Sequence, residues 1–340
     1  PPPPPPPTTT LELDRRQRQM CIRDSYKSAH YGKWHLDSDP GSEGYEEHDG
    51  NLNNSPGTTL EDVSVIPPDF TNPKRMHEIT DRTIAFMDKQ QQAGHPFYIQ
   101  LSHYAQHEPR ECLPASRARY QNHPHVVAYN GNKTNPDDIS ARQDPAVWLG
   151  MLYDLDQTLG DLMQELEDRG IADNTYLIVM SDNGYRNDWQ MEDHPLHARK
   201  WWAWQGGVRV PMVVRGPGIA ADSLCTANVV NYDLMPTFLE WAGGNPTRLQ
   251  NIDGISIAGL MAGEDPTEAF LNRSIYFHYP HYRTSLPHSA IIRGQHKVVY
   301  FYDTPVIEPG WNPIMLFDLA SDAGEYHNIQ PLEPLLANEL

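Results

Sequence analysis

The segment Tyr176–Gly184, which reads Tyr-Leu-Ile-Val-Met-Ser-Asp-Asn-Gly, constrains the fold of this chain more than any other. Its first five residues are apolar or aromatic without alternation, which is typical of a strand buried on both faces of a parallel sheet. The polar cluster that follows predicts a turn. Ligands of open α/β sheets bind beyond the carboxyl ends of strands, so Asp182 and Asn183 are candidates to bind Ca²⁺ or Mg²⁺. An ordinary turn is the alternative interpretation.

Helical and strand patterns alternate around this segment. Apolar residues in Pro145–Gly170 recur at spacings of three and four, and Thr80–Gln92 has a shorter pattern of the same kind. Strands are predicted at Phe97–Leu101 and Val208–Arg215. This alternation predicts an α/β fold with a mixed, mostly parallel central sheet flanked by helices.

The composition excludes two classes of protein and leaves the redox compartment open. A formal charge of -19 without a basic stripe argues against a nucleic-acid-binding protein. No apolar run approaches the length of a membrane span. The three cysteines, Cys21, Cys112 and Cys225, lack metal-ligand spacing and permit one disulfide without requiring it.

Three segments lack a helical or strand pattern. Residues 1–25 begin with seven prolines and contain no apolar signal-peptide core, so we expect a non-native or disordered N-terminus; a polyproline II spacer is the alternative. Residues 37–75 are rich in Gly, Asn, Asp, Ser and Pro, which predicts a long surface loop. Residues 110–145 are polar and predicted to be irregular.

Two candidate side chains lie in the segment Tyr26–Leu36. If this segment is a strand, Lys33 and His35 point to the same face, where both could address one anion or one nucleophile. A plain surface strand is the alternative interpretation.

Further candidates follow the later strands. His103 and His107 are four residues apart, which on a helix would suggest a metal pair, but their position between a strand and Pro109 predicts a loop. His107 lies farther out and is the better candidate. Lys200 precedes three tryptophans, whose surroundings would partly desolvate its ammonium group and make it attractive to an anion. Core filling is the alternative role for these tryptophans.

Short aromatic runs separated by turn residues dominate the C-terminal part. Ser274–His281, Ser289–Arg293 and His296–Tyr302 predict strands of a small antiparallel subdomain. We therefore expect three parts: residues 1–25, an α/β domain over 26–265 and an antiparallel α+β subdomain over 266–340.

Four motifs in this order resemble the type I sulfatases of the alkaline phosphatase-like superfamily. Gly32–Leu36 is similar to their second signature, and Ser181–Gly184 to their metal-binding turn. His107, in His-Glu-Pro, is similar to the histidine after their inner strand. Lys200, six residues before the Gly-Gly-x-Arg-x-Pro run Gly206–Pro211, completes the set.

The resemblance implies an alkaline phosphatase-like fold and a sulfuric ester hydrolase, such as an arylsulfatase, acting on a sulfated carbohydrate or aryl sulfate. It also implies a Ca²⁺ cofactor, with Mg²⁺ as an alternative, and a formylglycine nucleophile. The resemblance implies that Asp182 and Asn183 are metal ligands. It implies that Lys33 and His35 contact the formylglycine and that His107 and Lys200 bind the sulfate. Of the two sulfate-binding residues, His107 would also be a candidate to protonate the leaving alcohol. Sulfatases are usually extracellular or periplasmic.

The N-terminal region departs from this family. The nucleophile motif is Cys/Ser-x-Pro/Ala-x-Arg, and Cys21–Ser25 lacks its partner residues. The two upstream aspartates that supply metal ligands are also absent. We therefore expect an N-terminally truncated sulfatase fragment that is inactive as written. Two alternatives remain: a phosphate or phosphonate ester hydrolase of the same superfamily, and a non-catalytic protein that binds sulfated glycans. The sequence does not indicate an oligomeric state.

Overall fold

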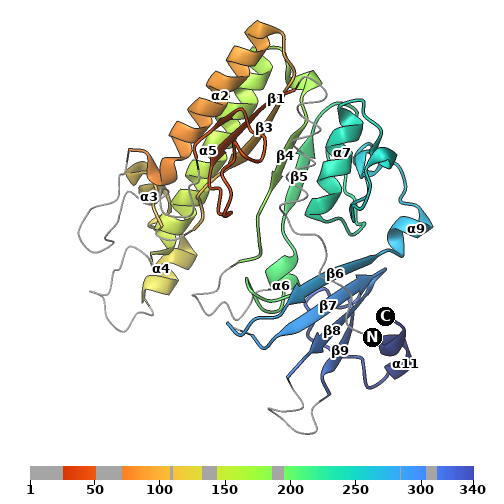
Figure 1. Ribbon diagram of the computed structural model, residues 1–340. Helices are drawn as coiled ribbons and strands as arrows, with labels where there is room; N and C mark the ends of the chain where they lie inside the picture. The colour runs from red at the N-terminus through yellow and green to blue at the C-terminus, as the bar shows by residue number, and fades with distance from the viewer. Residues whose placement is uncertain are drawn as a thin grey trace. The chain divides into compact units, whose positions relative to one another are not determined.

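The computed structural model describes residues 26–50, 71–107, 110–131, 144–185, 195–283, 285–303 and 312–340 (Figure 1). These residues form two compact units, each of which draws on two stretches of the chain. Unit 1 comprises the described residues of Pro1–Asp173 together with Leu234–Ile255, and unit 2 comprises those of Asn174–Asp233 and Ser256–Leu340. The mixed α/β fold with antiparallel C-terminal strands confirms the predicted fold class. The predicted domain boundary at residue 265 stays a prediction.

Unit 1 contains a parallel three-stranded sheet. Its strands, in spatial order, are β2 (Glu47–His48), β1 (Lys27–Gly32) and β3 (Phe97–Ser102). Residues of β1 and β3 pair in register from Lys27 with Phe97 to Gly32 with Ser102. The two strands therefore end side by side, and the loops that follow them start from the same edge.

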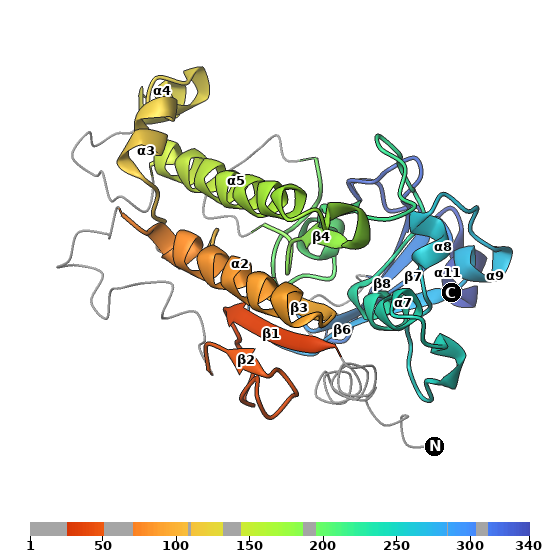
Figure 2. The same cartoon turned by 90° about the horizontal axis from the view of Figure 1, so that it is seen from above.

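Two long helices accompany this sheet. Helix α2 (Met76–Ala93) packs Ile79 and Phe86 against apolar residues of β1, and α5 (Pro145–Asp168) lies alongside α2 (Figure 2). The Asp144 side chain caps α5 by accepting a hydrogen bond from the Ala146 amide at 2.9 Å. Both helices were expected from their apolar spacing, although α2 begins four residues earlier than predicted.

Two segments expected to be irregular contain regular structure. Residues 110–145 include α3 (Pro114–Tyr120) and α4 (Pro124–Gly131), so the prediction of an irregular segment is wrong. Each of these helices begins with proline, which suits the first helical position because its missing N–H would be unpaired there anyway. The predicted loop 37–75 likewise contains β2 and the short helix η2 (Pro73–Arg75).

Unit 2 contains a two-stranded sheet that differs from the expectation. Strand β4 (Leu177–Met180) pairs with β5 (Met212–Arg215), and the pairing is antiparallel. The side chains of Val179 and Met180 are 39% and 37% exposed, so the prediction of a strand buried on both faces of a parallel sheet is wrong. The predicted strand Val208–Arg215 is also shorter than expected, because a helical turn and Pro211 precede its first paired residue.

The C-terminal part of unit 2 confirms the predicted antiparallel subdomain. Its sheet consists of four strands in sequence order, β6 (Ser274–Tyr279), β7 (His288–Arg293), β8 (His296–Phe301) and β9 (Ile314–Asp318). One face packs against Ala203 and Trp204, and the other packs against α11 (Pro334–Glu339).

The remaining helices are short. They are η4 (Ala172–Asn174), α6 (Gln205–Val208), η5 (Asn231–Asp233), α7 (Leu234–Trp241), η6 (Pro246–Arg248), α8 (Ala258–Met261) and α9 (Glu268–Leu271). No helix in the described part of the chain combines the length and the apolar character needed to cross a membrane.

Candidate functional site

The candidate residues of unit 1 lie in the loops that follow β1 and β3, whose ends are side by side. The Lys33 amide donates to the Ser102 carbonyl at 2.8 Å, which joins the two strand ends. Gly32 has a φ of +92°, and a Cβ at this position would lie 2.1 Å from the Ser102 oxygen. Glycine is therefore required here both for its backbone conformation and for the close approach of β3.

Lys33 and His35 lie in the loop after β1, because the strand ends at Gly32. The prediction that they share one face of a strand is therefore wrong. The residue between them anchors the loop: Trp34 is buried, and its Nε1 donates to the Ser38 carbonyl at 2.5 Å. Lys33 is half-buried and His35 is exposed.

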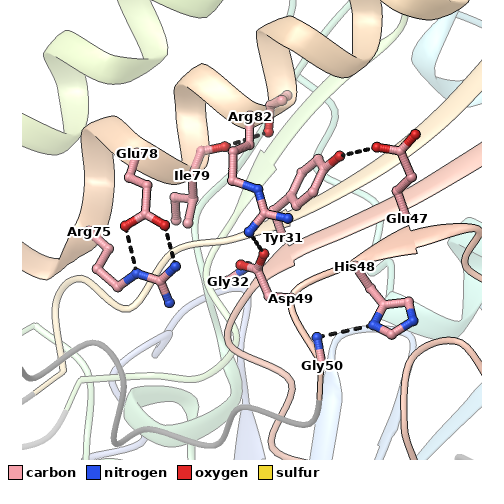
Figure 3. A network of polar contacts seen from close by, with 11 residues as sticks. Tyr31, Gly32, Glu47, His48, Asp49, Gly50, Arg75, Glu78, Ile79 and Arg82 are labelled. Atoms are coloured by element: carbon pink, nitrogen blue, oxygen red, sulfur yellow. Dashed lines mark hydrogen bonds and ion pairs between the residues drawn. The ribbon is translucent and has the colours of Figure 1, made fainter.

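A carboxylate that sequence reasoning missed holds the Gly32 corner (Figure 3). Asp49 accepts a hydrogen bond from the Gly32 amide at 2.9 Å and forms an ion pair with Arg82 of α2. The Asp49 side chain is only 1% exposed. The guanidinium of Arg82 also lies 4.7 Å from the centre of the Tyr31 ring. Asp49 directly follows β2, a strand of two residues that is too short to show a pattern.

His107 lies in a turn after β3, where its amide donates to the Tyr104 carbonyl at 2.9 Å. The prediction that His103 and His107 are not on a helix is confirmed. Burial, with a contribution from nearby His77, lowers the pKa of His103 to about 4. His103 is therefore neutral at pH 7.

Asp182 and Asn183 form a turn directly after β4, as predicted. The Ser181 hydroxyl donates to the Asn183 carbonyl at 2.9 Å, and the Asn183 Nδ2 donates to the Gly184 carbonyl at 2.8 Å. Asp182 is exposed. Because the Asn183 amide nitrogen is engaged with the backbone, its Oδ1 is the atom suited to bind a cation.

Two backbone hydrogen bonds join this turn to the loop that carries Lys200. The Gly184 amide donates to the Gly207 carbonyl at 2.9 Å, and the Lys200 amide donates to the Tyr185 carbonyl at 2.8 Å. A Cβ on Gly184 would lie 2.0 Å from the Gly206 carbonyl oxygen, so side chains are excluded where the two segments cross. Unit 2 therefore brings together the predicted metal turn and the predicted sulfate-binding lysine.

The six predicted residues are divided between the units. Unit 1 carries Lys33, His35 and His107, whereas unit 2 carries Asp182, Asn183 and Lys200.

The donor atoms of Asp182 and Asn183 fit Ca²⁺ or Mg²⁺ in kind, since hard cations prefer carboxylate and amide oxygens. They do not fit in number, because Ca²⁺ takes about six to eight oxygen ligands. Among the described residues there is no group of three or more His, Cys, Asp or Glu side chains that could hold a metal ion.

Neither cysteine in the described part of the chain has the setting of a nucleophile motif. Cys112 packs against Met76, Val147 and Met151, and burial is the main cause that raises the pKa of its thiol to about 12. A thiol with this pKa is protonated at pH 7 and unreactive. Cys225 is exposed and Ala227 fits the Pro/Ala position of the motif, but Val229 stands where the motif requires arginine.

Comparison with known proteins gives a family. The family model described as Sulfatase matches residues 15–244, and that described as N-sulphoglucosamine sulphohydrolase, C-terminal, matches residues 193–334. A sulfatase of Formosa agariphila is 28% identical over 285 residues, which cover 77% of this chain and 47% of the relative. N-acetylglucosamine-6-O-sulfatase of Bacteroides thetaiotaomicron is 28% identical over 186 residues, covering 54% of this chain and 31% of the relative. The chain thus spans about half or less of the length of these relatives.

Solved structures agree on the fold. Ps i-CgsB in complex with k-i-k-neocarrahexaose has a TM-score of 0.72 at 22% identity, covering 95% of this chain and 71% of the other. A structure of a protein in complex with its substrate, D-glucosamine-2-N,6-O-disulfate, has a TM-score of 0.70 at 19% identity, covering 95% of this chain and 79% of the other. The match of the sulfatase model to more than half of the sequence shows that this chain belongs to the sulfatase family.

Proposed function

We propose that this chain carries most of the sulfate-ester site of a sulfuric ester hydrolase that acts on a sulfated carbohydrate. One observation supports this most: the Asp182–Asn183 turn and the Lys200 loop are joined by hydrogen bonds at 2.8 and 2.9 Å. A cation-binding turn next to a half-buried lysine suits a substrate that carries a fixed negative charge.

The site residues would divide the work as follows. As the resemblance to sulfatases implies, Lys200 of unit 2 and His107 of unit 1 would each be a sulfate-binding residue, and His107 would give its proton to the leaving alcohol oxygen. Lys33 and His35 donate hydrogen bonds to the attacking group. Asp182 and Asn183 would supply two of the oxygen ligands of Ca²⁺, or of Mg²⁺. Formylglycine, where the full-length protein has it, supplies the nucleophilic hydroxyl.

The substrate class and the location follow the relatives. The proteins in the two solved complexes bind a disulfated glucosamine and a neocarrahexaose, and one relative is N-acetylglucosamine-6-O-sulfatase. A further relative, from Drosophila melanogaster, is described as an extracellular sulfatase. We therefore propose a sulfated glycan as the substrate and an extracellular or periplasmic location.

Sulfate release from N-acetylglucosamine-6-sulfate tests the proposal. The natural full-length protein should release sulfate, and its Lys200→Met variant should be slower by about 100-fold, the effect of removing one charge-stabilising donor. Lys89→Met, at a surface lysine whose side chain is 65% exposed, is the matched control and should match the unmodified protein. Equal rates for the two lysine variants would reject the role of Lys200.

The 340-residue chain by itself should bind the sulfated sugar without releasing sulfate. Its sequence contains no Cys/Ser-x-Pro/Ala-x-Arg run, so the nucleophile precursor is absent from these residues. Steady release of sulfate by this chain would overturn that expectation.

A phosphate or phosphonate ester is the competing substrate class. A multifunctional alkaline phosphatase superfamily protein of Trinickia caryophylli is 25% identical over 319 residues, covering 81% of this chain and 58% of that relative. Parallel assays with matched sulfate and phosphate monoesters separate these two classes. Binding of sulfated glycans in preference to unsulfated ones, without turnover by the full-length protein, would favour a non-catalytic protein that binds sulfated glycans.

A further inference from the structure

We propose that Glu325 is a positioning residue that holds the Lys200 loop against the Asp182–Asn183 turn, with buried Lys297 neutralising its charge. This inference rests on the proposed function for the role of Lys200, whereas the placement of the loop is independent of it.

The pair lies in the interior of unit 2. Lys297 Nζ and Glu325 Oε1 are 2.5 Å apart, and both side chains are 0% exposed. Burial lowers the pKa of Lys297, while the neighbouring Glu325 opposes that shift. Removing two charged groups from water is costly, and a buried ion pair often stabilises no better than apolar residues would. A gain in stability therefore does not by itself explain why this pair is buried. The other contacts of Glu325 offer an explanation.

Glu325 uses its second oxygen to bind the backbone of the motif that follows Lys200. Its Oε2 accepts a hydrogen bond from the Gln205 amide at 2.5 Å. Gln205 directly precedes Gly206 and Gly207, and Gly207 is the residue that accepts from the Gly184 amide. A single carboxylate thus connects strand β8 to the glycine pair that contacts the metal turn.

The main chain next to Glu325 holds the beginning of the same loop. The His197 amide donates to the Gly324 carbonyl at 3.1 Å, and the His197 Nδ1–H donates to the Glu325 carbonyl at 3.1 Å. The Gly206 amide in turn donates to the His197 carbonyl at 2.8 Å. Both ends of the segment 197–206, with Lys200 between them, are therefore attached to residues 324 and 325.

A histidine of the C-terminal sheet holds the middle of the segment. His288 Nε2 accepts from the Ala203 amide at 2.9 Å, so its Nδ1–H donates to the Leu286 carbonyl at 2.7 Å. The antiparallel subdomain thus contacts the Lys200 loop at its start, middle and end. Only the Glu325 contact uses a charged group that requires its own buried counterion.

Two neutral double variants of the 340-residue chain separate the hydrogen bond from the ion pair. Lys297→Met/Glu325→Gln keeps an acceptor for the Gln205 amide, whereas Lys297→Met/Glu325→Leu removes it. Replacing both charges with uncharged groups avoids leaving an unpaired buried charge, so both variants should fold. Hydrogen exchange of peptides covering residues 197–207 should be about tenfold faster in the Leu variant, because a local contact is lost there. In the Gln variant it should match the unmodified chain.

Binding of inorganic sulfate gives the second readout. The Leu variant should bind sulfate at least several-fold more weakly than the Gln variant. Equal exchange over residues 197–207 in the two variants would overturn the positioning role, whatever their affinity for sulfate. If the unmodified chain and Lys200→Met bind sulfate equally, the proposed role of Lys200 fails instead, and exchange alone decides the role of Glu325.

His197→Phe provides a test that leaves the ion pair intact. Phenylalanine can keep the stacking of this ring on Trp204 and Tyr326, whose centroids lie 4.6 and 5.8 Å away, but cannot donate to the Glu325 carbonyl. Faster exchange over residues 197–207 is expected, with a smaller increase than in the Leu variant. If the Leu variant does not fold and His197→Phe exchanges like the unmodified chain, the proposal is rejected.

Discussion

Asp49 in unit 1 and Glu325 in unit 2 make the same kind of contact with the backbone in different surroundings. Each is a buried carboxylate that accepts a backbone N–H at a glycine-containing motif, from Gly32 itself in one case and from Gln205, which precedes Gly206, in the other. Their cations differ. The Arg82 side chain that pairs with Asp49 is 42% exposed, whereas the Lys297 side chain that pairs with Glu325 is 0% exposed.

This difference shows where each corner obtains its rigidity. The Gly32 corner is also fixed by β3, because the Lys33 amide donates to Ser102 at the end of a six-residue parallel pairing. Residues 197–207 around Lys200 contain no strand. Besides the two backbone hydrogen bonds to residues 184 and 185, contacts with the C-terminal subdomain hold them. We therefore expect a change to the cation at Glu325 to have a larger effect than a change to the cation at Asp49.

Of the single substitutions, Lys297→Met should have the largest effect on stability. It leaves the Glu325 carboxylate buried without its counterion, which typically costs about 3–5 kcal/mol in the free energy of unfolding. Hydrogen exchange in β8 and in residues 197–207 should report the loss. Lys27→Met, which removes a surface pair with Glu46, should change the stability by about 1 kcal/mol or less. A similar small effect for Lys297→Met would show that the buried pair is not coupled to the fold.

A fall in pH should also destabilise unit 1. Burial, with a smaller contribution from His48, lowers the pKa of His30 to about 4, and His103 is shifted to the same value. Unfolded histidines bind protons below about pH 6.5, so the free energy of unfolding should fall between pH 6.5 and 4, by about 3 kcal/mol for His30 alone. Exchange of α2 and β1 peptides between these pH values measures the fall. His30→Gln should make the profile shallower, with the His103 contribution remaining, and His95→Gln, at an exposed position, should leave it unchanged.

Gly184→Ala should have the next largest effect on the free energy of unfolding. The added methyl group would meet the Gly206 backbone at 2.0 Å, and overpacking of this kind costs about 1–3 kcal/mol. Gly160→Ala is the matched control: it lies in α5 with nothing within 4 Å of its Cβ, so it should stabilise by about 0.5–1 kcal/mol. Urea unfolding of both variants checks the opposite signs. Tolerance of alanine at position 184 would contradict the close crossing of the two loops.

Arg82→Met should have a smaller effect than Lys297→Met, about 1–3 kcal/mol, because Asp49 is buried but the Arg82 guanidinium is 42% exposed, so solvent screens the pair. Asp49 would keep its hydrogen bond from the Gly32 amide. Hydrogen exchange of the amides of residues 32–36 measures the loss of stability at this corner. A loss as large as that of Lys297→Met would show that the two corners depend equally on their cations.

The sequence predicted the elements with local signals and missed those held by distant contacts. The apolar spacing of Pro145–Gly170 and the Asp-Asn-Gly turn after β4 were both recognised correctly. The antiparallel pairing of β4 was not, because an unbroken apolar run does not distinguish the direction of its neighbour. Asp49 and Glu325 were missed because their partners lie 17 and 120 residues away in the chain. Resemblance to sulfatases located the motif residues, and the structure adds the carboxylates that hold them.

The rate of sulfate release from N-acetylglucosamine-6-sulfate by the natural full-length protein tests the central claim most directly. Measured beside the matched phosphate ester and beside Lys200→Met, it should show preferred hydrolysis of the sulfate ester and a fall of about 100-fold in the variant. Preferred hydrolysis of the phosphate ester, or a rate unchanged by Lys200→Met, would contradict the account.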